Sequence, residues 1–379
     1  MRHPGRVARV TNHEQEQSLI RWRRGTVREL GRSWRGAREL IVQVEPRGDE
    51  PEGTARALAY PALVGEPQVG DGVLLNTTAL AMGLGTGGYA VLIANTSRLP
   101  EDRSGPGHLV KMRYSPLQAT VLGVDEQDSP HHADIAATTD VGGMPVVVAD
   151  LHSAVPAIVA GILAELPEAR IAYIYGDGGA LPAWFSRSVA DLGDRLAGTI
   201  TVGQAVGGDY EAVTTHSALI AARVVLDADI AIVAQGPGNL GTGTPWGFSG
   251  VAAGEAVNAA YAVGGRPVGA LRVSDADPRG RHVGVSHHAT TAFFKVAQVP
   301  LDLPLPTNLP AELATAIEAD LADRPARAAL MQVETEGLDE ALRDLPVRLS
   351  TMGRSLDEDY SYFLVNAAAG RHAATLIDS

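Results

Sequence analysis

Between residues 144 and 306, apolar runs short enough for strands alternate with longer segments of helical pattern. Polar residues are scarce in these runs, and strands of this kind are buried on both faces, as in a parallel sheet covered by helices. We expect strands at residues 145–151, 170–175, 199–203, 229–234, 266–273 and 299–305, and helices at 154–166, 181–196, 209–227 and 249–263. The alternation predicts an α/β fold, with three layers around a mostly parallel sheet.

The segment before it has a different pattern, in which closely spaced strands are separated by Gly, Pro and Asp residues. The expected strands are residues 37–44, 54–60, 72–76, 89–94 and 118–124. Strands without intervening helices are typical of a small antiparallel β barrel or sandwich. We therefore divide the chain into a flexible basic arm (1–18), a small β barrel or sandwich domain (19–126), a linker (127–143), the α/β parallel-sheet domain (144–306) and a helical C-terminal extension (307–379).

Composition limits the class of protein. Cysteine is absent, which excludes disulfides and thiolate metal sites and fits a cytoplasmic location. No apolar run reaches the ~18 residues of a membrane span, and no stretch has the pattern of a secretory signal. Residues 1–40 hold ten Arg and four Glu, whereas the whole chain has a net charge of −13. Because duplex binding needs clustered cations, this balance argues against nucleic acid as a partner, and a homo-oligomer stays open.

The most glycine-dense segment, residues 236–250, directly follows the expected strand 229–234. A loop rich in free amides between a strand and a helix can bind an anion. The segment begins with the G-x-G-x-x-G pattern of dinucleotide-binding folds, but its strand is the fourth of the sheet and the next helix begins too late. A plain surface loop and a ligand loop of another kind therefore stay open. The ligand-binding candidates here are Gly236, Gly238, Asn239, Gly241, Thr242 and Gly243.

Polar residues stand at the carboxyl ends of the first two expected strands of the sheet. Ligands of open α/β sheets bind at these strand ends. Asp150, His152 and Asp177 are therefore candidate catalytic residues. His152 is placed where a general base or a metal ligand would be useful. The alternatives are helix capping and ordinary hydrogen bonding for Asp150 and His152, and a plain turn for Asp177. His216 shares the apolar face of an expected helix, so we expect it in the core.

A second polar loop, residues 272–291, follows the fifth expected strand. Asp275, Arg279 and Arg281 are candidate ligand-binding residues, since two arginines could hold a carboxylate or phosphate. His287 and His288 are candidate catalytic residues, but neighbouring side chains diverge in regular structure, so we expect that they do not share one metal ion. No established metal motif is present, and the metal and cofactor content stays unknown. The alternative for this loop is a charged surface turn.

Four segments carry a resemblance to a known family: residues 69–77, 108–118, 235–243 and 284–288. Over most of its length the chain is similar to a family from high-GC Gram-positive bacteria that is known only as a domain of unknown function. The resemblance implies a soluble bacterial protein. It transfers no catalytic residue, because the family carries no assigned activity.

The combined pattern predicts a soluble protein that binds an anionic small molecule or nucleotide at the carboxyl edge of the sheet. The glycine-rich loop, Arg279 and Arg281 would hold the anion, and the candidate catalytic residues would supply acid–base or metal chemistry, which leaves enzyme activity open. The alternative is a non-catalytic interaction or scaffold protein that uses the β domain and the basic arm.

Overall fold

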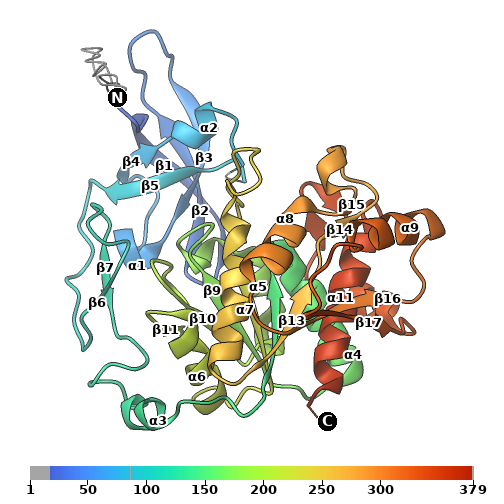
Figure 1. The fold of residues 1–379 in the computed structure, drawn as a ribbon. Coiled ribbons are helices and arrows are strands. Elements are labelled where there is room, and N and C mark those ends of the chain that lie inside the picture. Colours follow the sequence, from blue (N-terminus) through green and yellow to red (C-terminus); the bar gives the residue numbers. More distant parts are fainter. Residues whose placement is uncertain (1–17, 86, 378–379) are drawn as a thin grey trace, which may run out of the picture. The chain divides into compact units, whose positions relative to one another are not determined.

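A computed structural model describes residues 18–85 and 87–377 (Figure 1), and the chain forms two compact units. The first unit comprises Met1–Ser33 and Ala37–Glu101, and the second comprises Trp34–Gly36 and Asp102–Ser379. The expected basic arm lies outside the described residues except for Ser18. The division falls after Glu101, so the expected linker and the segment before it, residues 102–143, belong to the second unit.

The first unit is a closed five-stranded barrel with the order β1-β2-β3-β5-β4. Its strands are β1 (Trp22–Trp34), β2 (Ala37–Val44), β3 (Gly53–Ala59), β4 (Gly72–Asn76) and β5 (Ala90–Asn95), with the short helices α1 (Pro61–Val64) and α2 (Thr78–Ala81) between them. Most recorded pairs are antiparallel, but β3 and β5 run parallel. Leu40, Leu75 and Leu92 fill the barrel. Sequence patterns missed β1, because most of its side chains are exposed and mask the strand period.

The second unit is built on an eight-stranded sheet with the order β11-β10-β9-β12-β8-β13-β16-β17. Every neighbouring pair in it is parallel. The strands are β8 (Pro145–Ala149), β9 (Ile171–Gly176), β10 (Gly198–Thr201), β11 (Tyr210–Glu211), β12 (Ile230–Gln235), β13 (Arg266–Ala270), β16 (Leu301–Pro306) and β17 (Ala328–Val333). The predicted α/β fold with a parallel sheet is therefore confirmed.

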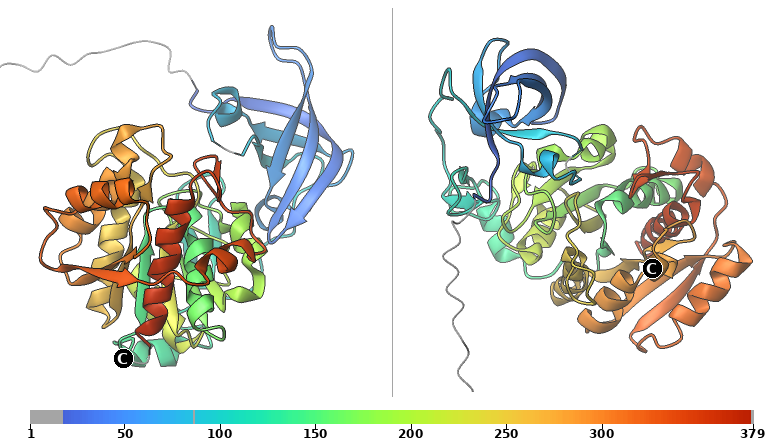
Figure 2. Two further views of the ribbon diagram at one scale, coloured as in Figure 1. Left: turned by 90° about the vertical axis from the view of Figure 1, so that its right-hand side faces the viewer. Right: turned by 90° about the horizontal axis from the view of Figure 1, so that it is seen from above.

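Helices cover both faces of this sheet (Figure 2). One face carries α4 (Val155–Glu165), α5 (Arg187–Leu192), α10 (Leu338–Arg343) and α11 (Tyr360–Thr375). The other carries α6 (Thr215–Val224), α7 (Ala252–Ala262), α8 (His287–Thr290) with the π-helical segment Thr291–Val296, and α9 (Ala311–Asp320). The remaining elements are β6 (Leu109–Lys111), β7 (Ala119–Val121), α3 (His132–Ala137), β14 (Val273–Ser274), β15 (Gly284–Val285), β18 (Ser350–Thr351) and β19 (Arg354–Ser355).

Several expected elements differ from the observed ones. The helix expected over 181–196 is α-helical only in α5, with a short 3-10 turn on either side. The helix expected over 209–227 is β11 followed by α6, which begins after its N-cap Thr214, where Thr214 and Ser217 form a capping box. The strand expected at 118–124 is β7, which pairs with β6 and lies outside the barrel order. The C-terminal extension is not purely helical, because β17 adds an edge strand to the sheet. The run AALMQV of β17 is mostly apolar but was not predicted as a strand from the sequence.

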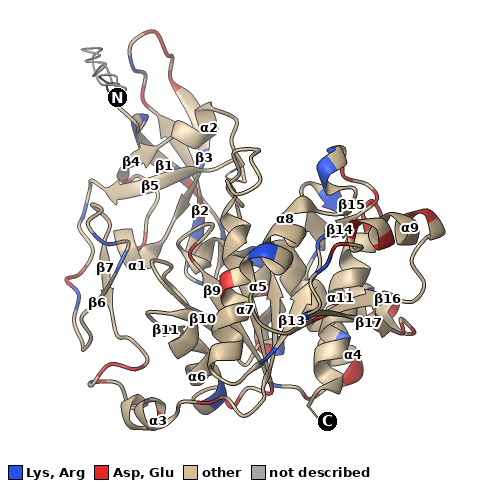
Figure 3. Cartoon of the chain, viewed as in Figure 1, with Lys and Arg blue, Asp and Glu red and all other residues tan. Residues whose placement is uncertain are grey.

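The central strands β8, β9 and β12 contain no Lys, Arg, Asp or Glu (Figure 3). No helix within residues 18–85 and 87–377 is both long enough and apolar enough to cross a bilayer.

Helices α4 and α11 touch through their backbones. A Cβ atom added at Gly161 of α4 would lie 1.8 Å from the carbonyl oxygen of Ala367 in α11. A Cβ atom at Gly370 of α11 would lie 2.1 Å from the carbonyl oxygen of Ile158 in α4. Because real Cβ atoms do not approach oxygen so closely, each helix needs glycine at this crossing.

We predict that Gly161→Ala lowers the free energy of unfolding by about 1–3 kcal/mol, the usual cost of an overpacked core. The loss should occur although alanine favours a helix more than glycine does. Denaturant unfolding measures it. Gly280→Ala is the matched control, because a Cβ atom there meets nothing within 4 Å. Equal unfolding midpoints for both variants would contradict the prediction.

Candidate functional site

The order of the strands creates a crevice at the carboxyl edge of the sheet. The central strands β8 and β12 are neighbours, but the chain leaves β8 through α4 on one face and leaves β12 through α7 on the other. Connections that depart to opposite faces leave a gap between them, and ligands of open α/β sheets bind at this position. The strand order therefore singles out the ends of β8, β12 and β9 before any side chain is considered.

A pocket of about 300 Å³ lies at this point. The ends of β8, β9 and β12 and the first turns of α6 and α7 line it. Its apolar lining includes Val202, Val233, Ala253 and Ala256, and its polar lining includes Asp150, Asp177, Thr214, Thr215, His216, Gln235, Ser249 and Glu255. No Lys or Arg is among the described residues that line it.

Two kinds of polar group at the pocket have no hydrogen-bond partner among the described residues. The Oε1 atom of Gln235 is buried and has no hydrogen-bond partner among the described residues, whereas its Nε2 atom donates to the Asp150 carbonyl (2.7 Å) and to Asn239 Oδ1 (2.9 Å). At the start of α6, Thr214 Oγ1 accepts from the Ser217 amide (3.2 Å). The first amides of a helix have no partner inside it, so those of Thr215 and His216 are left for water or a ligand.

The glycine-rich loop bonds mainly to itself. Gly241 pairs with Phe248, and the Thr242 amide donates to the Gly247 carbonyl (2.7 Å). Asn239 Oδ1 accepts from the Gly250 amide (3.2 Å) and so closes the loop at the start of the α7 segment. Gly238 and Gly243 have positive φ angles of 92° and 79°, which suits glycines that serve turns. None of the loop's six candidates is among the pocket-lining residues, so ligand binding by Gly236, Gly238, Asn239, Gly241, Thr242 and Gly243 stays a prediction.

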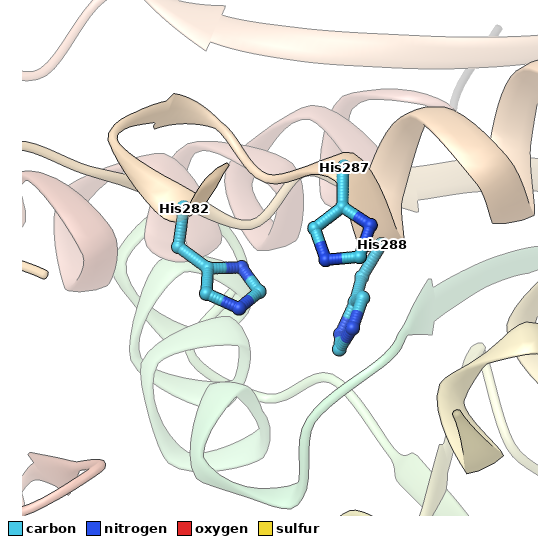
Figure 4. Close-up of side chains that lie close together, drawn as sticks. All are labelled: His282, His287 and His288. Carbon is cyan, nitrogen blue, oxygen red and sulfur yellow. The ribbon is translucent and has the colours of Figure 1, made fainter. Parts of the chain in front are cut away.

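Three histidines gather beyond the same edge of the sheet. His282, His287 and His288 each present a ring nitrogen, and these atoms lie within 4.8 Å of one another (Figure 4). The rings of His287 and His288 have centroids 4.4 Å apart, so the two side chains do not diverge as expected, and the prediction that they share no metal ion loses its geometric reason. Side-chain rotamers bring the rings together although the backbone directions diverge. The ring of His288 is held by stacking on Phe248, with centroids 3.7 Å apart.

Asp150 lies beside this cluster. Its Oδ2 atom is 3.9 Å from His288 Nδ1, and this oxygen is buried and accepts no hydrogen bond from the described residues. Burial raises the pKa of Asp150, and the positive charge of Arg272 partly opposes that effect. Burial first, and Arg272 second, lower the pKa values of His282 and His288 to about 3. Both rings are therefore neutral at pH 7, the form in which imidazole binds metals.

The arginines of the second loop have different surroundings. Arg279 is already paired, since its Nε and Nη2 atoms lie 2.9 and 2.7 Å from the two oxygens of Asp277. Arg281 is exposed and forms no ion pair with the described residues. Asp275 is exposed and accepts a hydrogen bond from Ser361 (3.3 Å). Of the three ligand-binding candidates in this loop, Arg281 is thus the charge left available.

The five catalytic candidates do not form one group. Asp150, His287 and His288 come together. His152 instead lies on the α4 side of the sheet, where its Nε2 atom is 2.7 Å from Ser186 Oγ and its Nδ1 atom 3.0 Å from the Tyr173 hydroxyl. Asp177 stands at the rim of the pocket, where it accepts from the Gln204 amide (2.8 Å).

Sequence reasoning missed several residues of these sites. His282 is the third histidine of the cluster, and its place in the same histidine-rich loop was the available signal. His216 was expected in the core, but it is exposed and lines the pocket, because α6 begins at Thr215 and turns its first residues toward the sheet edge. Gln235 gave no signal beyond its position at the end of an apolar strand.

Comparison with known proteins adds one finding. The profile of a family described as "Protein of unknown function (DUF3866)" matches residues 56–370, which is most of the chain. No curated protein matches the chain.

The buried His152 should make stability depend on pH. Burial lowers its pKa to about 4, whereas an unfolded histidine has a pKa near 6.5. Between these values only the unfolded state takes up the proton, so the contribution of neutral His152 to stability falls as the pH drops through this window. We predict that the stability difference between wild type and His152→Gln is about 2 kcal/mol smaller at pH 5 than at pH 7, at about 1.4 kcal/mol per pKa unit.

Denaturant unfolding of both proteins at the two pH values measures this change. Contributions from the other histidines are common to both proteins and cancel in the difference. A difference in stability that is the same at pH 7 and pH 5 would show that His152 is not held neutral by burial.

Proposed function

The chain belongs to the DUF3866 family, and we propose that it binds an anionic small molecule, of mononucleotide size and class, in the pocket at the ends of β8, β9 and β12. The observation that carries the proposal is the meeting of two unsatisfied features at this pocket. The first amides of α6 need acceptors, and the buried Gln235 Oε1 needs a donor.

The start of α6 supports an anionic group on the ligand. Ten residues of aligned peptide dipoles place partial positive charge at Thr215 and His216. Helix N-termini of this kind commonly bind phosphate or carboxylate groups through their amides. Because no cationic side chain lines the described pocket, the amides are the groups that would hold the anion.

The rest of the lining supports a ligand that also donates hydrogen bonds. Asp177 and Glu255 stand exposed at the pocket and would repel an ion that is only negative. Sugar hydroxyls or an amino group would satisfy these carboxylates and Gln235 Oε1. The apolar lining at Val233 and Ala256 suits a flat ring. A nucleotide carries all three kinds of group.

The size of the pocket favours a mononucleotide over a dinucleotide. Its volume of about 300 Å³ is at the lower limit of the usual range for small-molecule pockets. The dinucleotide pattern that begins at Gly236 gains no support, since that loop forms a self-bonded hairpin.

We predict that Thr215→Asp abolishes binding of nucleoside monophosphates and inorganic phosphate, whereas Thr215→Asn weakens it only slightly. A carboxylate in the first turn of α6 stabilises the helix through its dipole, by about 0.3–1 kcal/mol, but repels an anion at the same amides. Thermal unfolding with each compound measures binding, because a ligand at one hundred times its Kd adds about 2.7 kcal/mol to stability.

A second pair of variants tests whether the ligand binds in this pocket, because one of them reduces the volume of the pocket without changing its charge. Ala252 lines the pocket from the first residue of α7, and Ala262 is exposed at the last residue of the same helix. Ala252→Leu should weaken binding, and Ala262→Leu should not. If no anionic compound stabilises the wild type, or if both leucine variants bind equally well, the pocket is not the binding site.

A further inference from the structure

We propose that His282, His287 and His288 form a binding site for a divalent transition-metal ion of the zinc class, with the Asp150 carboxylate beside it. This site lies outside the proposed nucleotide pocket and does not depend on it, since none of the three histidines lines that pocket.

The spacing of the rings suits one ion. Two nitrogens bound to a tetrahedral zinc ion at about 2.1 Å lie about 3.4 Å apart. The three ring nitrogens lie within 4.8 Å of one another, so a pair of them has to approach by up to about 1.4 Å, which small rotations of the rings supply. Figure 4 shows the three side chains close together, with His282 on the loop and His287 and His288 on adjacent positions of α8.

The rings of His282 and His287 each keep a nitrogen free for an ion, and His288 keeps Nε2, because its Nδ1 lies 3.4 Å from Nη1 of Arg272. His282 Nδ1 lies 2.6 Å from Ser286 Oγ, which orients the ring and leaves Nε2 available. His287 Nε2 is buried and has no hydrogen-bond partner among the described residues. A buried polar atom without a partner is costly, and coordination of a metal ion would remove that cost. A ligating histidine usually has its other nitrogen held by a neighbouring group, as His282 has.

The chemistry of the surrounding groups points to the zinc class. Imidazole nitrogens are preferred by zinc, copper, nickel and iron, whereas magnesium and calcium prefer oxygen. Three neutral histidines leave the ion its full charge, and the Asp150 carboxylate can offset part of it. Three protein nitrogens also leave a coordination position open for water or a ligand.

Metal content tests the proposal with the full chain. After removal of metal with a chelator, the wild type is expected to bind one Zn²⁺ or one Co²⁺ per chain. Visible absorption of the Co²⁺ form should show the strong bands of a four- or five-coordinate ion, and zinc X-ray absorption should count three imidazole nitrogens. These measurements need no variant. Binding of less than half an equivalent, or a spectrum with fewer than two imidazoles, would overturn the proposal.

Variants locate the ion. His287→Gln and the double variant His282→Gln/His287→Gln should bind Zn²⁺ at least about a hundredfold more weakly than the wild type. His131→Gln is the matched control, because it breaks the chain's other pair of adjacent histidines, and should bind as the wild type does. Unchanged affinity in a folded double variant would contradict the proposal, as would equal loss in the control. If the double variant does not fold, His287→Gln, in which the stacked His288 is kept, decides the location.

Discussion

The parallel hydrogen bonding of β12 between β8 and β9 determines where the candidate groups of this protein lie. Val233 of β12 is in register with Val148 of β8 and Ile174 of β9, so the three strands end at one edge. The chain then leaves these neighbours toward opposite faces, and the gap between the departing segments is the pocket. If β12 paired elsewhere, neither Gln235 nor the start of α7 would face the end of β8.

Asp150 connects the two candidate sites. Its carbonyl oxygen accepts from Gln235 Nε2, and the residue lines the pocket. Its carboxylate is close to the histidine cluster, because Oδ2 lies 3.9 Å from His288 Nδ1. Gly250, the last residue of the glycine-rich loop, packs closely on Asp150. A Cβ atom at Gly250 would lie 3.2 Å from Asp150 Cβ. A change of charge or position at Asp150 is therefore expected to affect both the nucleotide pocket and the histidine cluster.

The sequence predicted the parallel sheet because β8, β9 and β12 are apolar on both faces, a pattern that few other structures share. It also placed Asp150 and Asp177 at one edge, since the carboxyl ends of parallel strands coincide. It did not predict which residues meet, because apolar periodicity does not encode strand order. The rings of His287 and His288 come together because of their rotamers and because His288 stacks on Phe248. Neither can be predicted from the spacing of residues in the sequence. The self-bonded loop after Gly236 likewise became visible only in three dimensions.

The glycine crossing of α4 and α11 has a consequence for synthesis of the protein. Helix α11 packs on β8, β13 and β16, although it follows all three in the chain by many residues. Until α11 has been made, the apolar face that includes Val147 and Val268 lacks the cover that α11 gives it. The narrow backbone contact at Gly161 needs a helix with glycine at the matching turn, which α11 supplies at Gly370, so a helix without such a glycine does not fit at this place.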